Sequence, residues 1–278
     1  MTMAMRCLTL FSVVLTVASI LGSVWPVLAQ DQDWIEPVSG LEIRSFQAPG
    51  ASGSGLLAVV RADPGRFKIR LAMATELGGR PDTVKAWAWR TGMVAAINAG
   101  MYRADDTLRS TGYMRRGGHV NNGYVNPGYG AFLVFEPDNA TLPAVRIVDR
   151  AEEPWEELVA RYRTVIQNYR MVSIHGENLW PEDGPRISIA AVGLDRQGRI
   201  LFMHSSTPRT QHEFNKVILG LPLEVHNAMY VEGGPEACLY VRAGEMERVW
   251  TGTTGRGLWR AESDQLWPVP NVLGLVPK

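Results

Sequence analysis

The sequence predicts an α+β fold with a mixed, largely antiparallel sheet core, about three helices and a single domain. Apolar runs of strand length recur along the chain and are separated by turn-forming residues, including 28 glycines and 17 prolines. Segments with helical spacing are few, and strand pairs stand before and after them, which favours α+β over a doubly wound parallel sheet. No long Ser-, Gly- or Pro-rich linker divides the 278 residues, so one domain is expected.

The N-terminus predicts export. Arg6 is the only charged residue before an uncharged run over residues 7–30, whose apolar core spans residues 8–21. Val27-Leu28-Ala29 supplies the small-residue pattern of a cleavage site, so residues 1–29 are interpreted as a signal peptide for the periplasm or the exterior. The alternative is an uncleaved single-span anchor, because the uncharged run is long enough to cross a bilayer.

The first half of the mature chain combines an extended entry with strands and one helix. Asp63-Pro64-Gly65 has turn chemistry between two apolar runs, and Asp82 can cap the helix that follows. The expected elements are an extended segment over 30–55, a hairpin of strands over 56–62 and 67–74, a helix over 81–91 and a buried strand over 93–97.

The second half begins with a loop-rich stretch and then repeats strands and helices. Apolar residues from Trp155 to Tyr162 stand at helical spacing, residues 195–198 have turn chemistry, and Thr210 with Glu213 forms a capping box. The expected elements are a loop-rich stretch over 103–130, strands over 131–135 and 144–148, a helix over 152–167, a hairpin of strands over 187–194 and 199–204, a helix over 210–219 and a strand over 228–231. Residues 56–278 are thus assigned to one domain.

Composition excludes several classes of protein. Lys plus Arg and Asp plus Glu both number 28, so binding to nucleic acid through phosphate neutralisation is not expected. The five histidines form no short metal-ligand pair, and nucleophile-elbow, P-loop and dinucleotide motifs are missing, so we expect no metal and no cofactor. After signal cleavage only Cys238 remains. It stands in an apolar stretch without a basic neighbour, which favours a buried small residue over a catalytic thiol.

Two junctions place polar residues directly after buried strands. Asn98 follows Val94-Ala95-Ala96-Ile97, and Gly100 lets the backbone turn or approach a ligand. Glu232 follows Ala228-Met229-Tyr230-Val231, and Gly233-Gly234 would bring two unhindered amides near an anion. A carboxylate there could act as general acid or base, or hold a sugar hydroxyl. The competing interpretation is a strand-ending turn with a solvated glutamate.

The order of these motifs resembles the phosphodiester glycosidase domain family. This family has uncovering-enzyme-like members, which act on N-acetylglucosamine-1-phosphodiesters, and bacterial exopolysaccharide-related members. The resemblance covers about residues 55–245. The matching pieces are Ala96–Tyr102, Ser110–Gly112, Gly128–Phe132, Gln167–Val172, Arg186–Gly193 and Asn227–Gly234. Glu232 stands where the family more often has Asp, and Pro235-Glu236 replaces a Gly-Ser or Ser-Ser pair.

The resemblance implies an exported hydrolase acting on a sugar-1-phosphodiester or related cell-envelope glycan linkage. Glu232 would then be the acid/base, and Asn98 would bind substrate or shape the loop. Glu236, four residues after Glu232, is a second carboxylate for the same site. The remaining candidate substrate-binding residues are Arg186, Arg115, Arg116, Arg103, Gln167, Gly100, Gly233 and Gly234, with arginine suited to holding a phosphate.

A non-catalytic alternative also follows from the sequence. The residues after Gly234 lack the hydroxyl that commonly follows the Gly-Gly pair in the resembled family. A pocket that is kept without turnover would make this chain a periplasmic glycan-binding or exopolysaccharide-assembly protein. In either case the expected partner is a carbohydrate or sugar phosphodiester, with no membrane span after signal cleavage.

Overall fold

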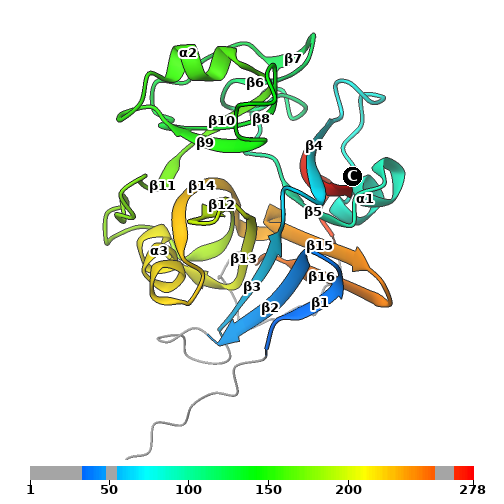
Figure 1. Ribbon diagram of the computed structural model, residues 1–278, viewed down its shortest axis with the longest axis vertical. Coiled ribbons are helices and arrows are strands. Elements are labelled where there is room, and N and C mark those ends of the chain that lie inside the picture. Colours follow the sequence, from blue (N-terminus) through cyan, green and yellow to red (C-terminus); the bar gives the residue numbers. More distant parts are fainter. Residues whose placement is uncertain (1–32, 48–54, 254–265) are drawn as a thin grey trace, which may run out of the picture. The chain divides into compact units, whose positions relative to one another are not determined.

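The structure of the protein is a computed structural model that describes residues 33–47, 55–253 and 266–278 (Figure 1). The predicted signal peptide and the alternative N-terminal anchor lie outside these residues. Residues 31–278 cluster as one compact unit. Within the described ranges, no helix combines the length and the apolar character needed to cross a membrane.

Three sheets form the framework, and every strand pairing among the described residues is antiparallel. The seven-stranded sheet has the order β1 (Ile35–Val38), β2 (Leu41–Gln47), β3 (Leu56–Ala62), β13 (Ile200–Arg209), β12 (Ile187–Asp195), β14 (Val225–Gly233) and β11 (Arg170–Val172). One five-stranded sheet has the order β7 (His119–Asn122), β6 (Met114–Arg116), β10 (Tyr162–Asn168), β8 (Ala131–Pro137) and β9 (Val145–Asp149). The other has the order β16 (Met246–Thr251), β15 (Cys238–Ala243), β5 (Ala95–Asn98), β17 (Asn271–Pro277) and β4 (Phe67–Met73). The predicted α+β class with an antiparallel core is confirmed.

Three α-helices are described, α1 (Val84–Thr91), α2 (Trp155–Ala160) and α3 (Gln211–Gly220), together with a 3-10 turn over Gly234–Glu236. The capping box predicted for α3 is present: Thr210 Oγ1 accepts from Glu213 N at 3.1 Å, and Glu213 Oε2 accepts from Thr210 N at 3.1 Å. The cap of α1 is Thr83 rather than the expected Asp82, because the Thr83 hydroxyl accepts from the backbone of the first helical turn.

The helix predicted over 152–167 is wrong beyond its first half. Helix α2 ends at Ala160, and the chain continues as β10. Thr164, Val165 and Ile166 are β-branched, which restricts them in a helix and suits a pleated strand. They pair with both β6 and β8, so tertiary pairing overrides the helical spacing that precedes them.

The hairpin predicted from strands 56–62 and 67–74 is also wrong, although both strands exist. The turn forms as expected, since Asp63 O accepts from the backbone N–H groups of Arg66 and Phe67 at 3.0 Å. However, β3 pairs with β2 and β13, whereas β4 pairs with β17 in another sheet. The turn therefore carries the chain between two sheets.

The segments expected to lack strands also contribute to the sheets. The extended segment over 30–55 contains β1 and β2, so the seven-stranded sheet begins before residue 56. The stretch over 103–130 contains β6 and β7.

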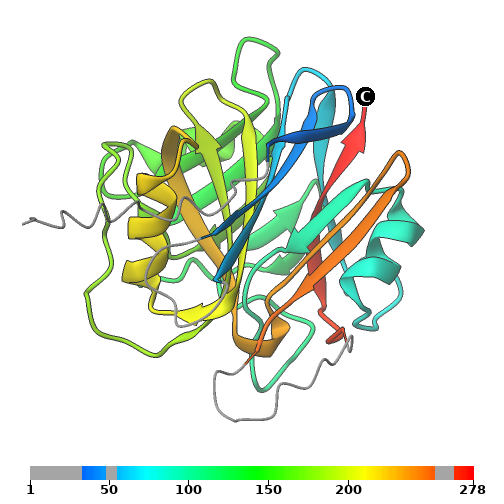
Figure 2. The same ribbon diagram turned by 90° about the horizontal axis from the view of Figure 1, so that it is seen from below.

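The central core lies where the three sheets face one another. It draws residues from each sheet, for example Val60, Ile97 and Leu133. Smaller clusters lie on the outer faces, where α3 packs on the seven-stranded sheet and α1 on the sheet of β5 (Figure 2). Helix α2 packs on the sheet of β10 (Figure 1). This arrangement brings the last residues of β5, β10 and β14 close together, and the candidate site is built there.

Candidate functional site

Asn98 ends β5 and links it to the segment after the Gly-Gly turn. Its Oδ1 accepts from Cys238 N at 2.8 Å and from Cys238 Sγ at 3.3 Å, and its Nδ2 donates to Glu236 O at 2.9 Å. The side chain is 1% exposed. Both ends of the amide are thus occupied by the protein, so Asn98 fixes the turn that carries Glu236. Gly100, with φ +143°, lies beside Asn168 at the end of β10.

Glu232 lies on β14, one residue before the Gly-Gly pair, and is 8% exposed. Its Oε1 accepts from Gly233 N at 3.1 Å. Burial raises the pKa of Glu232 from 4.5 to about 8; the Gly233 hydrogen bond opposes this, and the charge of Glu236 adds to it. The competing interpretation of a solvated glutamate is therefore wrong: this carboxyl is buried and keeps its proton at neutral pH.

Glu236 provides the second carboxyl, held by a tyrosine from the first junction. The Tyr102 hydroxyl is hydrogen-bonded to the Glu236 side chain. Burial, then the charges of Glu236 and Glu232, raises the pKa of Tyr102 to about 12, so this hydroxyl stays protonated and donates. The two junctions predicted from sequence thus meet at one place.

The two glycines after Glu232 are required for different reasons. Gly234 has φ +72°, a left-handed conformation that other residues rarely adopt, and the Glu236 carboxylate lies beside it. A Cβ on Gly233 would stand 2.2 Å from Tyr230 Oη and 2.4 Å from Ile187 Cδ1. Gly233 therefore allows the Tyr230 hydroxyl to lie directly against the backbone of the turn.

Four aromatic rings lie next to Glu232 and Glu236, which we call the carboxyl pair. Tyr169 contacts Tyr129 with ring centroids 4.4 Å apart, Trp180 at 5.4 Å and Tyr230 at 6.4 Å. Burial, followed by the charges of Glu232 and Glu236, raises the pKa of Tyr230. Tyr169 is 36% exposed, so this cluster offers part of an aromatic face to a ligand beside the buried carboxyl.

Arg186 lies at the same end of the seven-stranded sheet. It precedes Ile187, whose side chain lies against Gly233. The guanidinium is ion-paired with Glu213 at the start of α3 and is 58% exposed, so solvent can reach it. Arg209 lies opposite Ile187 in the next strand, and its buried Nε and Nη2 have no hydrogen-bond partner. It is a second cation that the sequence did not single out.

Arg115 and Arg116 are not brought to Glu232. They lie in register with Val165 and Thr164 on β10, toward the strand end opposite Asn168. Arg115 Nη2 donates to Tyr162 O at 2.7 Å, and Arg116 pairs with Glu76 at 3.2 Å. Their partners hold both guanidinium groups at the far end of that sheet.

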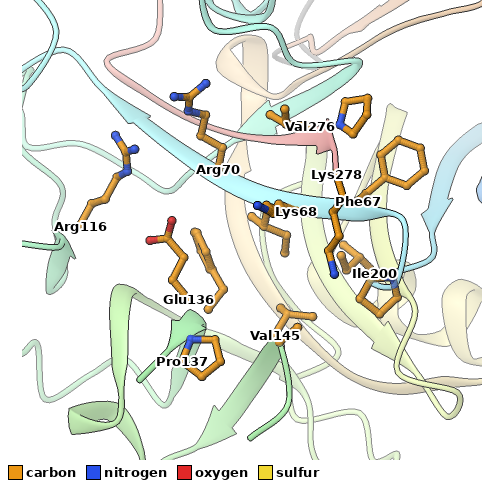
Figure 3. A pocket seen from close by; sticks show the side chains of 15 residues that line it. Phe67, Lys68, Arg70, Arg116, Glu136, Pro137, Val145, Ile200, Val276 and Lys278 are labelled. Carbon is orange, nitrogen blue, oxygen red and sulfur yellow. The ribbon is translucent and has the colours of Figure 1, made fainter. Parts of the chain in front are cut away.

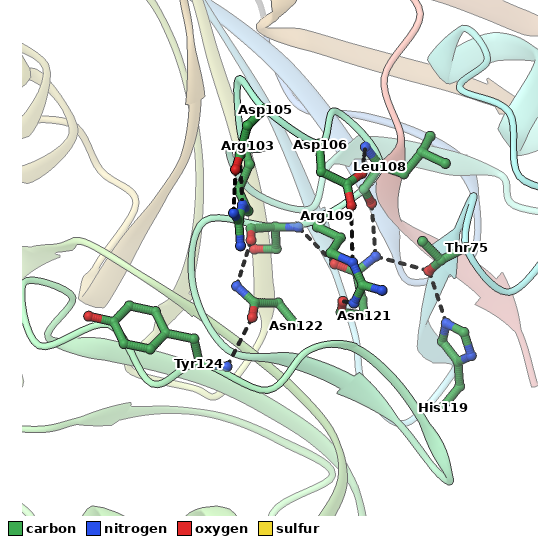
Figure 4. A network of polar contacts seen from close by, with 11 residues as sticks. Thr75, Arg103, Asp105, Asp106, Leu108, Arg109, His119, Asn121, Asn122 and Tyr124 are labelled. Carbon is green, nitrogen blue, oxygen red and sulfur yellow. Dashed lines mark hydrogen bonds and ion pairs between the residues drawn. The ribbon is translucent and has the colours of Figure 1, made fainter.

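Arg103 belongs to a network that braces the loop after Tyr102 (Figure 4). Its Nε donates to Asp105 Oδ1 at 2.8 Å. Asn121 Oδ1 accepts from Ser110 N at 2.7 Å, and Ser110 pairs with Tyr102 through an isolated bridge. Arg103 is thus committed to a local ion pair, while the network positions Tyr102.

Gln167 lies in β10 and is 1% exposed, not at a helix end as the sequence suggested. Its Oε1 accepts from Asn126 N at 2.8 Å and Tyr113 N at 3.2 Å. Its Nε2 donates to Asn126 O at 2.8 Å and Tyr129 O at 3.0 Å. Gln167 therefore holds the loop that carries Tyr129, and its side chain is not turned toward a substrate.

His204 and Cys238 are buried against the site and carry no charge. Ala190 separates Glu232 from His204 in the sheet register, and His204 Nε2 lies 3.1 Å from Ala237 O. Burial lowers the pKa of His204 to about 4 and raises the pKa of the Cys238 thiol. The interpretation of Cys238 as a buried small residue is confirmed. Nothing in the sequence around His204 indicated its place next to the site.

The arrangement suits proton transfer by side chains. A carboxyl that stays protonated near neutral pH, beside a second carboxylate, can divide the roles of acid and base. In the described ranges, no group of three or more His, Cys, Asp or Glu side chains is placed to hold a metal ion.

Comparison with known proteins gives a family match and two structural likenesses. The phosphodiester glycosidase family matches residues 91–276, a range that includes Asn98, Arg186 and Glu232. A hypothetical protein from Synechocystis superposes with a TM-score of 0.61 at 14% identity over 88% of this chain, which spans 63% of that protein. The zebrafish N-acetylglucosamine-1-phosphodiester alpha-N-acetylglucosaminidase catalytic domain, auto-inhibited by its pro-peptide, gives 0.61 at 14% identity, covering 90% of this chain and 87% of that one. No curated protein matches. These likenesses show a shared fold.

Proposed function

The chain belongs to the phosphodiester glycosidase family, and on this premise we propose that it is an exported hydrolase. Its substrate is a sugar-1-phosphodiester or a related cell-envelope glycan linkage. The observation that carries the proposal is the buried Glu232, which keeps its proton at neutral pH beside the Glu236 carboxylate. The solved zebrafish relative acts, by its name, on an N-acetylglucosamine-1-phosphodiester, which agrees in chemistry with this substrate class.

The two carboxyl groups have different roles, because Glu232 donates a proton and Glu236 accepts one. Glu232 donates its proton to the departing oxygen as the bond between the sugar C1 and that oxygen breaks. Glu236 accepts a proton from the water whose oxygen bonds to C1, and the Tyr102 hydroxyl orients this carboxylate. Bond making and breaking balance as the addition of one water molecule. Arg186, which is solvent-exposed, holds the phosphate in this scheme.

Export is supported by the sequence and by cysteine chemistry. Residues 1–29 carry the pattern of a cleaved signal peptide. Cys238 is the one cysteine left after cleavage at Ala29, so the mature domain would form no intramolecular disulfide, and its thiol is buried away from oxidants. N-terminal sequencing of the exported protein tests this: a start at Gln30 is expected, and a start at Met1 would instead support the anchored form.

A second candidate is a glycan-binding protein without turnover. Pro235-Glu236 supplies no hydroxyl after the Gly-Gly pair, and the aromatic cluster around Tyr169 could hold a sugar ring without chemistry. Binding of a sugar phosphodiester by wild-type protein with no product formed would favour this candidate over hydrolysis.

The test of hydrolysis uses matched substitutions of one carboxyl. Turnover of an aryl-linked sugar phosphodiester is measured for wild type, Glu232→Gln, Glu232→Asp and Glu245→Gln. Glu245 is an exposed glutamate in the turn between β15 and β16 and serves as the control. General acid–base catalysis contributes about 10²–10⁴-fold, so Glu232→Gln should lower kcat at least about a hundredfold. Glu232→Asp should lose less, because it keeps an ionisable carboxyl.

Unfolding temperature distinguishes lost chemistry from lost structure. Glu232→Gln preserves volume and one hydrogen-bond acceptor, so the folded state should persist. Equal turnover by wild type and a folded Glu232→Gln variant would remove Glu232 from the mechanism, and Glu236 would be tested next.

A further inference from the structure

A cavity of about 520 Å³ lies far from Glu232, where the two five-stranded sheets approach each other (Figure 3). It is lined mainly by residues of β4, β6, β8, β9 and β17, with Ile200 of β13. Its position follows from strand register: Arg116 of β6 pairs with Thr164, near the start of β10, whereas Asn168 at the end of β10 adjoins the Glu232 site. The cavity and the carboxyl pair are therefore at opposite ends of the same sheet.

The cavity carries an excess of positive charge. The side chains of Lys68, Arg70, Arg116 and Lys278 line it, against one carboxylate side chain, that of Glu136. Arg116 is already paired with Glu76, so Lys68, Arg70 and Lys278 supply the excess of cationic side chains. The whole chain has a formal net charge of zero, so this is a local concentration of cations. Lys68 has no ion-pair or hydrogen-bond partner among the residues described, whereas Arg70 Nη1 donates to Thr91 O at 2.8 Å.

Two neighbouring cavities extend the same surface. One of about 460 Å³ shares Arg116 and Glu136 and adds Arg163 together with Glu76, the ion-pair partner of Arg116. The other, of about 270 Å³, shares Arg70 and Arg116 and adds Arg90, which is paired with Asp82. We call the three together the cationic groove. A spherical anion needs one cluster of donors, whereas successive cationic hollows suit an elongated ligand with several negative groups.

Glu136 places a carboxylate among the cations of the groove. It has φ +58°, an unusual conformation for a residue with a Cβ, and residues held in this way concentrate at functional positions. Its carboxylate accepts a hydrogen bond from the Thr164 hydroxyl. Figure 3 shows Glu136 facing the same space as Lys68 and Arg116. A carboxylate among cations can accept hydrogen bonds from hydroxyl groups, and a carbohydrate carries several of these on each ring.

The apolar lining narrows the ligand further. Phe67 and Phe135 are 4% and 2% exposed, so neither ring offers a face for stacking a nucleic-acid base. Pro137, Val276 and Pro277 are not fully buried, and they add small apolar surfaces between the charges. Cations for acidic groups, a carboxylate for hydroxyls and apolar patches for C–H faces together match an acidic carbohydrate.

We propose that the cationic groove is a second, non-catalytic site that binds an anionic oligosaccharide, its acidic groups paired with Lys68 and Arg70 and its hydroxyls with Glu136. The choice of a carbohydrate as the ligand rests on the proposed glycan-hydrolase function. The inference that the ligand is anionic rests only on the charge and the shape of the groove. Such a site would hold the enzyme on an acidic cell-envelope glycan while the carboxyl pair at the other end acts on its substrate.

The test measures binding of oligogalacturonate, a carboxylated oligosaccharide, by calorimetry, with neutral dextran oligosaccharide and inorganic phosphate as comparison ligands. Lys68→Glu should raise the Kd for oligogalacturonate about five- to tenfold, because it removes one attraction and adds one repulsion. The matched control is Lys216→Glu, which makes the same charge change on the exposed face of α3 and should leave Kd unchanged. Binding should weaken with added salt.

The outcomes separate the groove from the active site. Lys68→Glu should leave turnover of a small sugar phosphodiester unchanged, and Glu232→Gln should leave oligogalacturonate binding unchanged. Equal weakening by the Lys68 and Lys216 variants, or equal binding of dextran, would overturn the proposal. Binding of phosphate as tight as that of oligogalacturonate would overturn the assignment to a carbohydrate. Failure of the hydrolysis assay alone would leave the binding result standing.

Discussion

Replacing Glu232 by Gln should change how stability depends on pH. Burial raises the pKa of Glu232 from 4.5 to about 8 in the folded protein, while the unfolded chain keeps the ordinary value. Below about pH 4.5 Glu232 is protonated in both the folded and the unfolded state, so its ionisation does not change the free energy of unfolding. Between these two pKa values the unfolded state releases a proton that the folded state retains, so wild-type stability falls as the pH rises and levels off above about pH 8.

The size of this effect follows from the same two values. The rise of the pKa from 4.5 to about 8 corresponds to a loss of at most about 5 kcal/mol between the two ends of the window. Glutamine cannot ionise, so the variant lacks this loss. Its free energy of unfolding, relative to wild type, should increase by a few kcal/mol as the pH rises from about 5 to about 9.

Urea unfolding at several pH values measures this difference directly. Glu245→Gln is the matched control, because that carboxyl is exposed. A stability difference between Glu232→Gln and wild type that stays constant across the window would refute the assigned pKa and the burial argument behind it. Wild-type kcat should also fall above about pH 8, where Glu232 loses the proton that it donates.

Three further substitutions test the groups that hold the site. Asn98→Ala should lower the unfolding free energy by about 2–4 kcal/mol in urea titrations, because it leaves the buried Cys238 amide and a backbone carbonyl without partners. Gly233→Ala should keep the fold but lower kcat/KM at least about tenfold, since the new Cβ must displace the Tyr230 hydroxyl; a rate equal to wild type would contradict that packing. Gln167→Ala should speed proteolytic cleavage near Asn126 and Tyr129, because the four hydrogen bonds that its side chain makes to residues 113, 126 and 129 are lost.

The sequence predicts an element correctly where residues close together in the chain determine it. Helix α3 could be placed because Thr210 and Glu213 define its start within four residues. The turn at Asp63 was likewise visible, but turn chemistry does not reveal which strand pairs with which. Strands β3 and β4 find their partners in β13 and β17, more than a hundred residues away, and no residue near the turn encodes that choice.

The candidate site likewise combines residues that the sequence could identify with contacts that form only in the folded chain. Asn98 and Glu232 could be selected because each follows an apolar strand, and Gly233 and Gly234 mark the close approach beside them. The hydrogen bond from Tyr102 to Glu236 and the position of His204 depend on strands that are brought together only in the fold. Arg115 and Arg116 were attractive in sequence because they follow the first motif, but the strand that carries them runs away from the site.

The contacts of Asn98 explain how a buried acid can be stable at a strand end. Its amide binds backbone on both sides of Ala237, which fixes the turn and keeps Glu236 near Glu232. Burial is the main cause that disfavours a negative charge on Glu232, and the charge of Glu236 adds to it. The position of Glu236 thus depends on an amide that touches neither carboxyl. Any change that loosens this amide should let Glu236 move away and water enter, which lowers the pKa of Glu232 and removes the donor needed at neutral pH.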